Sequence, residues 1–276
     1  MRQSLAHVFE YFDYFGYAPT LTEIYTFFPK KIARKNLSQL ISQEVIKGTL
    51  KHLPNKGYFR VSGQALDTVP QYSIITPKTL KLSIKIFLSF LRHCPFIRFV
   101  GITGASAMVG KRENDDLDLC VITQNQLLWT SRLIAILCAK LLRIHTKNGV
   151  CLNLFLDEEG LIIPEKKHNL YIAHEILQMK PLIDKNDTYR RFIFINKWIY
   201  RYFPNAKTST KTIVKTINTA QKRRVKTLYI LMDNYFKSIQ LPIIQRNKTA
   251  LFISPVQLWL FKKDFEKKLK RHGLVI

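Results

Sequence analysis

The spacing of apolar and polar positions predicts three helices at the start of the chain. Apolar residues recur every three or four positions over residues 4–14 and again over residues 31–43, which is the period of a helix that buries one face. Between these segments, Thr20 and Glu23 stand three residues apart, as in a capping box, a pattern that marks the first turn of a helix. We expect this second helix to end before Pro29, because proline cannot continue it.

Two short extended runs follow, at residues 48–53 and 57–61, and the Pro-Asn-Lys-Gly sequence between them favours a turn. Three helices and a two-stranded ribbon resemble a winged helix-turn-helix domain, here over residues 1–66. The start of its third helix carries four basic residues: Lys30, Lys31, Arg34 and Lys35. In winged helices this helix often enters the major groove of DNA. Many such domains contact only protein, so both interpretations stay open.

The middle of the chain alternates between strand-like runs and longer segments with helical spacing. The predicted strands are residues 96–103, 116–123 and 150–157, and the predicted helices are residues 77–92 and 127–144. This alternation indicates a small core with a mixed sheet, over residues 67–164. From there the pattern is helical and basic, and predicts a C-terminal helical domain over residues 165–276. The expected fold class is therefore α+β, with a mixed-sheet core between a winged helix and a helical domain.

The charge of the chain bears on its partners. Lys and Arg number 44 against 19 Asp and Glu, which gives a formal net charge of +25. A field of this sign attracts polyanions, so we expect a nucleic acid (RNA or DNA) or a nucleotide as partner, and it disfavours a small cationic substrate. The alternative is that many of the lysines only solvate the surface. The oligomeric state does not follow from the sequence.

Cysteine spacing and hydropathy indicate where the protein works. The four cysteines are far apart and form no Cys-x-x-Cys pair, so a zinc site is not expected, and reduced thiols in the cytoplasm are the simplest interpretation. The start of the chain lacks the apolar segment of a secretory signal, and the most apolar helix contains Arg132 and Lys140. We therefore expect a cytoplasmic protein that does not enter a membrane.

Two carboxylates, Asp116 and Asp118, lie in a run of strand-forming residues. Alternation places both on one face of the strand, while Leu117 and Leu119 point to the opposite, core face. Neighbouring carboxylates repel each other and lose hydration when they are buried, so a cation usually stabilises them. Mg²⁺ prefers such hard oxygen ligands. The pair therefore predicts a site for Mg²⁺, with Mn²⁺ as an alternative.

A glycine turn lies upstream of these carboxylates. The predicted strand ends at Thr103 and gives way to Gly104, where the absence of a side chain lets a phosphate approach the backbone. The short helix that follows offers free N–H groups to such an anion. A phosphate cradle and a metal pair on adjacent strands are suited to phosphoryl transfer.

These residues resemble the signature of a known family. Residues 100–106 read Val-Gly-Ile-Thr-Gly-Ala-Ser, and residues 114–119 read Asn-Asp-Asp-Leu-Asp-Leu. Together they resemble the DNA polymerase beta superfamily of nucleotidyltransferases, whose signature is an apolar strand, a glycine turn, a spacer and Asp-apolar-Asp on the next strand. Segments 128–133, 150–153 and 173–182 resemble a bacterial group of nucleotidyltransferase-domain proteins. In that group a winged-helix-like segment precedes the catalytic fold.

The resemblance implies roles for particular residues. Asp116 and Asp118 would bind the metal ions, and the turn would hold the triphosphate of an NTP. The residues of this turn are Gly104, Ala105 and Ser106. Ala105 departs from the family pattern, in which Ser or Gly is usual, so one hydroxyl contact to phosphate is missing.

A third carboxylate on a later strand serves many members as metal ligand and base. The counterpart in this chain is Asn153, which cannot accept a proton. Asp157 shares the strand face of Asn153 if the alternation continues, and it is the third catalytic candidate. Arg132 on the helix after the second strand could reach a nucleotide phosphate. The alternative for Arg132 is an arginine that extends from an amphipathic helix to solvent.

Two main functions follow from these features. The first is an enzyme: a Mg²⁺-dependent nucleotidyltransferase that moves a nucleoside monophosphate from an NTP to a hydroxyl, which could belong to a nucleic acid. The second is a nucleic-acid-binding regulator with a degenerate nucleotidyltransferase fold, and Asn153 in place of a carboxylate favours it. A third interpretation is an antitoxin-like partner of another protein.

Overall fold

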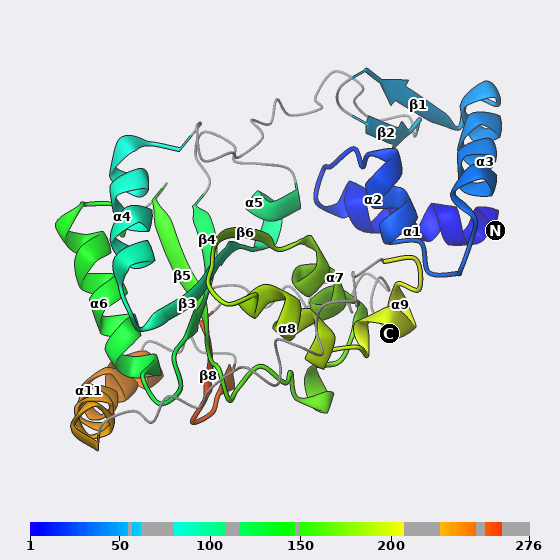
Figure 1. The fold of residues 1–276 in the computed structure, drawn as a ribbon. Helices are drawn as coiled ribbons and strands as arrows, with labels where there is room; N and C mark the ends of the chain where they lie inside the picture. Colours follow the sequence, from blue (N-terminus) through cyan, green and yellow to red (C-terminus); the bar gives the residue numbers. More distant parts are fainter. Residues whose placement is uncertain are drawn as a thin grey trace.

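The computed structural model of the protein describes residues 1–54, 57–61, 80–108, 116–146, 149–206, 227–246 and 252–260. Its centre is a six-stranded sheet with helices on both faces (Figure 1). The strands of this sheet are β3 (Ile97–Ile102), β4 (Leu117–Thr123), β5 (Val150–Asp157), β6 (Lys180–Asp184), β7 (Phe252–Ile253) and β8 (Gln257–Trp259). The helices around it are α4 (Leu82–His93), α5 (Gly104–Met108), α6 (Leu128–Leu141), α7 (Leu170–Gln178), α8 (Thr188–Ile195), α9 (Ile199–Tyr202) and α11 (Thr227–Arg246).

The order of the strands across the sheet is β6-β3-β4-β5-β8-β7. β4 and β5 run parallel and are connected through α6, whereas β3 pairs antiparallel with both β4 and β6. The sheet is therefore mixed, as the sequence pattern predicts. The three strands expected from that pattern are present, and their bounds agree to within one residue.

The segment after residue 165 is not only helical, and here the sequence-based prediction was wrong. β6 forms one edge of the sheet beside β3, and the β7–β8 hairpin extends it beside β5. β7 and β8 have two and three residues, too few for alternation to be visible in the sequence. β6 contains Pro181, which a strand tolerates only at an edge. Many basic residues of the segment, at 207–226 and 261–276, lie outside the described residues.

Two hydrophobic cores lie on opposite faces of the sheet. Leu117, Leu119 and Val121 of β4 are buried in the core that α4, α6 and α11 cover. The alternate residues Cys120 and Ile122 are buried in the other core, together with residues of α7 and α8. This division follows from the two-residue period of a strand. Among helices in the described part of the chain, none combines the length and the hydropathy that a membrane span requires.

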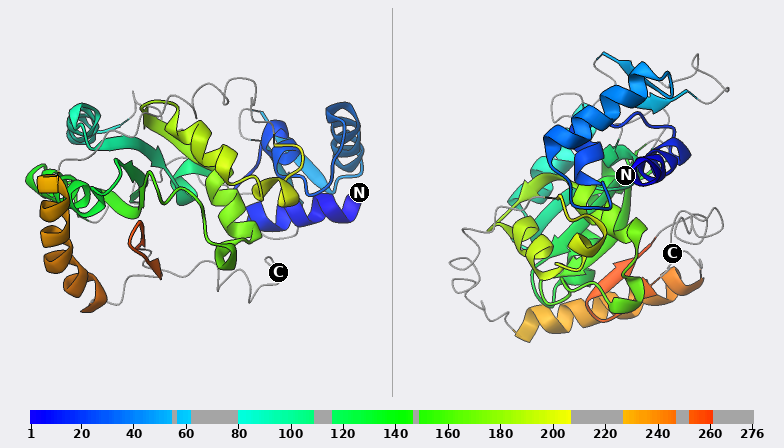
Figure 2. Two further views of the ribbon diagram at one scale, coloured as in Figure 1. Left: turned by 60° about the horizontal axis from the view of Figure 1, so that its bottom comes forward. Right: turned by 90° about the vertical axis from the view of Figure 1, so that its right-hand side faces the viewer.

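The described residues up to 61 form a unit that we call the N-terminal unit. It consists of α1 (Arg2–Tyr14), α2 (Leu21–Thr26), α3 (Arg34–Ile46) and the antiparallel hairpin of β1 (Leu50–Leu53) and β2 (Gly57–Arg60). The predicted capping box is present: the Thr20 hydroxyl accepts the Glu23 N–H at 3.2 Å, and the Glu23 carboxylate accepts the Thr20 N–H at 2.8 Å. The N-terminal unit and α11 lie on opposite sides of the sheet (Figure 2).

A buried asparagine attaches the N-terminal unit to the core. Asn205, in the turn after α9, accepts the Ile32 N–H at 3.0 Å. Its amide nitrogen donates to the carbonyl oxygens of Phe28, at 3.2 Å, and Lys30, at 2.8 Å. Because these bonds hold the backbone before α3 in a non-helical conformation, α3 begins at Arg34, later than the sequence pattern predicts.

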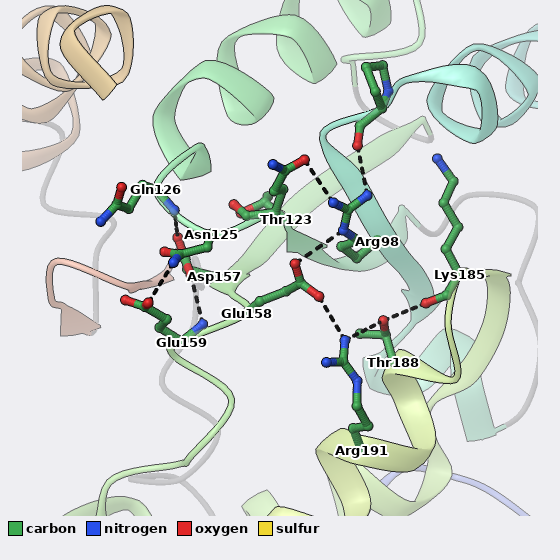
Figure 3. A network of polar contacts seen from close by, with 12 residues as sticks. Arg98, Thr123, Asn125, Gln126, Asp157, Glu158, Glu159, Lys185, Thr188 and Arg191 are labelled. Atoms are coloured by element: carbon green, nitrogen blue, oxygen red, sulfur yellow. Dashed lines mark hydrogen bonds and ion pairs between the residues drawn. The ribbon is translucent and has the colours of Figure 1, made fainter. Parts of the chain in front are cut away.

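Beyond the end of β5, one carboxylate joins two arginines from different elements (Figure 3). Glu158 accepts Arg98 Nε at 3.2 Å and Arg191 Nη2 at 2.8 Å, with one oxygen for each. Arg98 lies on β3 and Arg191 on α8. Solvent screens these ion pairs only in part. The exposed fraction of the side chain is 21% for Glu158, 14% for Arg98 and 13% for Arg191. Glu158 therefore ties α8 to the sheet.

We predict that Glu158→Gln lowers the free energy of unfolding by about 2 kcal/mol, because it leaves two mostly buried guanidinium groups without their carboxylate. Urea denaturation of the purified protein measures this change. Glu159→Gln is the matched control. Glu159 is exposed, and among the described residues its side chain bonds only to Asn125. The change in unfolding free energy for this control should stay within about 0.5 kcal/mol. Equal losses for the two variants would contradict the role assigned to Glu158.

Candidate functional site

Asp116 and Asp118 stand at the start of β4, on the face of the sheet that α7 covers. Asp118 is paired in register with Cys151 of β5, and the Cys151 thiol donates to Asp116 Oδ2 at 3.2 Å. Both carboxylates are partly exposed. The structure therefore brings the pair together on one face, as the alternation of the sequence predicts, and leaves it within reach of a ligand.

Gly104 faces Asp118 across the end of the sheet. Its φ of +64° lies in the left-handed region, which favours glycine. A Cβ atom at this position would lie 2.9 Å from Asp118 Oδ2, closer than real Cβ contacts. Both features favour glycine here, because a side chain would strain the turn and push the Asp118 carboxylate aside.

The other residues of the predicted phosphate turn have different surroundings. Ser106 is buried, with 2% of its surface exposed, and its hydroxyl donates to the Asp116 carbonyl oxygen at 3.1 Å. Its contact thus fixes the backbone of a carboxylate residue, whereas the sequence-based prediction gave it a phosphate contact. Ala105 lies next to Gly104 in α5, and nothing further bears on its predicted role.

A β-bulge places Asn153 beside Asp118. The register passes from Leu119 opposite Leu152 to Cys120 opposite Leu154, so Asn153 is the extra residue of β5. Bulges of this kind redirect side chains. The Asn153 amide donates to Asp118 Oδ1 at 2.5 Å. The residue expected at the position of a third carboxylate therefore does contact the site, as a hydrogen-bond donor.

Asp157 does not join the pair, in contrast to the sequence-based prediction. The bulge reverses the alternation beyond Asn153, so Leu154 and Leu156 are buried on the α7 side and Asp157 points the other way. Asp157 is also paired in register with Thr123, at the opposite end of β4 from Asp118, about 16 Å along the strand. The prediction relied on alternation alone, which neither reveals a bulge nor accounts for the length of strand between Asn153 and Asp157.

Asp157 holds the loop between β4 and α6 (Figure 3). Its two oxygens accept the Gln126 N–H at 2.6 Å and the Glu159 N–H at 2.8 Å. Gln126 has a φ of 58°, a conformation that is uncommon for residues other than glycine. Burial raises the pKa of Asp157 to about 7, which the two backbone donors oppose and the charges of Glu159 and Glu158 reinforce.

Arg132 lies away from the carboxylates as well. Its Nη1 donates to Gln240 of α11 at 2.6 Å, on the face of the sheet opposite to Asp118. Burial lowers the pKa of Arg132 to about 10. The side chain thus joins α6 to α11, and the structure does not bring it to the predicted nucleotide site.

Glu175 of α7 also contacts the site, and it was not among the predicted site residues. Its Oε2 accepts the Gly104 N–H at 2.9 Å and its Oε1 accepts the Gln178 amide at 2.9 Å. Burial raises the pKa of Glu175 to about 7, with the Gly104 N–H opposing this shift and the charge of Asp118 adding to it. The available signal was a lone acidic residue in an otherwise uncharged helix, which a core position rarely carries without a partner.

The donor set suits a hard divalent cation. Asp116 and Asp118 provide carboxylate oxygens, and rotation of the Asn153 amide by half a turn would present a carbonyl oxygen at the same place. Within the described ranges, no three His, Cys, Asp or Glu side chains are grouped as a complete metal site. The pair would therefore complete its coordination with water or with oxygens of a ligand, as Mg²⁺ commonly does.

Comparison of the chain with protein-family models, with curated proteins and with solved structures finds no match. The interpretation of the site therefore depends on its geometry and its chemistry. The resemblance to the DNA polymerase beta superfamily stays a prediction.

We predict that Asp157→Asn makes the stability of the protein less dependent on pH. The folded-state pKa of about 7 exceeds the value of about 3.9 in an unfolded chain. The folded protein therefore holds a proton that the unfolded chain releases, and stability falls as pH rises from about 4 to 7. Urea denaturation at several pH values measures the slope of the unfolding free energy against pH. In the variant this slope should be smaller by the amount that corresponds to about one bound proton. A variant with the wild-type slope would show that Asp157 is ionised throughout.

Proposed function

We propose that the protein is a divalent-metal-dependent nucleotidyltransferase, which moves a nucleoside monophosphate from an NTP to a hydroxyl acceptor. The observation that carries this proposal is the convergence of Asp116 and Asp118 beside the turn at Gly104. The two neighbouring carboxylates are partly exposed and lie beside a glycine turn, so a metal held by the carboxylates and a phosphate held by the turn would meet here.

Asp116 and Asp118 would hold the metal ion, Mg²⁺ or Mn²⁺. When bound, the ion would neutralise charge on the triphosphate and favour ionisation of the attacking hydroxyl. The side chains of the protein orient this pair. Asn153 fixes Asp118 by its amide, and Ser106 fixes the backbone of Asp116. Such fixed geometry lowers the reorganisation needed during transfer.

The basic surface supports a nucleic acid as acceptor. Lys30, Lys31, Arg34 and Lys35 are all exposed around the start of α3. The three helices and hairpin that carry them have the element order of a winged helix, in which this helix meets a phosphate backbone or a groove. The net charge of +25 would favour association with a polyanion over the whole surface.

The second candidate is a nucleic-acid-binding regulator that retains the fold and has lost turnover. Asn153 favours it, because an amide at this position neither ligates a metal as a carboxylate does nor accepts a proton. Against it stands the intact turn beside the carboxylates: Glu175 accepts the Gly104 N–H and holds that turn next to Asp118. Glu175 is buried and bonded to Gly104 and Gln178, so it supports the site from behind and does not supply a third metal ligand.

The decisive experiment is incubation of the purified protein with Mg²⁺ or Mn²⁺ and each labelled NTP, with and without total RNA. We expect incorporation of label, and we expect Asp116→Asn and Asp118→Asn each to lower its rate on the order of 100-fold or more, because each removes charge at the reacting phosphate. Asp187→Asn is the matched control, because Asp187 is an exposed carboxylate at the start of α8, and its rate should equal that of the wild type.

Two outcomes would count against the enzyme. Equal incorporation by the wild type and both site variants would assign the activity to a contaminant. Absence of incorporation with every NTP, together with salt-sensitive binding of nucleic acid, would favour the regulator.

Nucleic-acid binding has its own test. We predict that Lys31→Gln combined with Lys35→Gln lowers the slope of log affinity against log salt concentration by about 2, because each lost phosphate contact removes about 0.9. Fluorescence anisotropy with a labelled duplex measures this slope. Lys81→Gln combined with Lys140→Gln is the control, since these exposed lysines lie on or beside α4 and α6. Equal slopes for the two double variants would contradict an interface at α3.

A further inference from the structure

α7 has one face toward the N-terminal unit and another toward the candidate site. Its consecutive residues His174 and Glu175 therefore point to different places. His174 is 3% exposed and belongs to an aromatic cluster with residues of α1 and α2, whereas Glu175 bonds to the backbone of Gly104. One helix thus contacts both parts of the molecule.

The aromatic cluster fixes α7 against the N-terminal unit. The His174 ring is stacked on Tyr11 of α1 at 3.7 Å between centroids and on Phe27, next to α2, at 4.2 Å. The edges of Phe12 and Phe203 close the cluster at 5.9 and 4.5 Å. Burial lowers the pKa of His174 well below its ordinary value, so the ring is neutral and packs as an aromatic group.

Tyr11 is itself buried within the cluster. Its ring is 2% exposed, and burial raises the pKa of its hydroxyl. α1 therefore contacts α7 directly, through the stacking of Tyr11 on His174.

The Gly104 turn is restrained from two sides. On the β4 side, the Thr103 N–H donates to the Asp118 carbonyl oxygen at 2.9 Å and the Ser106 hydroxyl donates to the Asp116 carbonyl oxygen. On the α7 side, Glu175 accepts the Gly104 N–H. Gly104 adopts a left-handed conformation, in which an added Cβ atom would lie 2.9 Å from Asp118 Oδ2, and the helix that it begins, α5, is five residues long. A carboxyl oxygen accepts this N–H in either protonation state of Glu175, and the bond is stronger when the group is ionised. Glu175 is thus well suited to keep this short turn in place beside Asp118.

We infer that Glu175 is a positioning residue of the candidate site, and that α1 and α2 hold it in place through their packing on His174. The N-terminal unit is then part of the machinery of the site and not a separate attachment. A ligand that shifted α1 or α2 would shift the Gly104 turn with them. This inference rests on the proposed function for the meaning of the site, but the physical link from α1 to Gly104 does not.

The link is tested first without metal or nucleotide, by hydrogen–deuterium exchange of the full-length protein at residues 104–108. We expect Glu175→Ala to speed exchange of the Gly104 amide about 10-fold or more, because its acceptor is lost. Glu175→Gln retains a side-chain oxygen that can accept this N–H, so exchange should stay within about 3-fold of the wild type. Unchanged exchange in Glu175→Ala would overturn the inference.

The dependence on the N-terminal unit is tested with His174→Ala, which removes the ring at the centre of the cluster. We expect faster exchange in α1 and α2 and also at Gly104. Phe87→Leu is the control, because Phe87 is fully buried in the core on the other face of the sheet and its loss weakens the fold without touching α7. Faster exchange in α1 and α2 with an unchanged Gly104 would overturn the coupling.

Binding of Mn²⁺ with an NTP separates this inference from the proposed function. If Glu175 positions the turn, Glu175→Ala should raise the dissociation constant of the nucleotide about 10-fold, and Glu175→Gln should restore most of the loss. A purely structural role would lower the folded fraction and leave the constant unchanged. If the Gly104 amide exchanges faster in Glu175→Ala than in Glu175→Gln, but the wild-type protein binds no NTP, the proposed function is rejected. The physical link from α7 to the Gly104 turn then still stands. Equal nucleotide binding by the wild type and Glu175→Ala would overturn the positioning role.

Discussion

Asp118 and Glu175 are carboxyl groups on neighbouring elements that repel each other when both are ionised, and each is held in place by hydrogen bonds that other residues donate. Asn153 donates to Asp118, whereas Gly104 and Gln178 donate to Glu175. These donors offset part of the repulsion and of the lost hydration. In the proposed function, a bound cation would neutralise the remaining negative charge. The turn beside Asp118 has a left-handed conformation, which glycine adopts most easily.

The same carboxylate links the site to the rest of the chain. Because Glu175 lies on α7, the position of the Gly104 turn depends on how α7 packs, and one face of α7 packs on α1 and α2 through His174. Asn205 strengthens this attachment with three hydrogen bonds to the backbone before α3. The basic surface near α3 and the acidic site at β4 are therefore joined through buried contacts.

Much of the fold follows from sequence patterns, because long apolar segments have clear periods. The three central strands, α6 and the capping box at Thr20 are of this kind. The pairing of Asp116 with Asp118 follows from the same alternation. The sequence does not reveal β7 and β8, which are too short to show a period, or the bulge at Asn153, which reverses the alternation before Asp157. Glu175 was not predicted because its role depends on a contact with Gly104, 71 residues away.

A crystal structure with Mn²⁺ and a non-hydrolysable NTP analogue tests the central claim most directly. The account predicts an anomalous peak at carboxylate oxygens of Asp116 and Asp118, with the phosphates of the analogue beside Gly104. A well-ordered analogue bound elsewhere, or Mn²⁺ sites that do not include either aspartate, would contradict the assignment of this end of the sheet as a metal and nucleotide site.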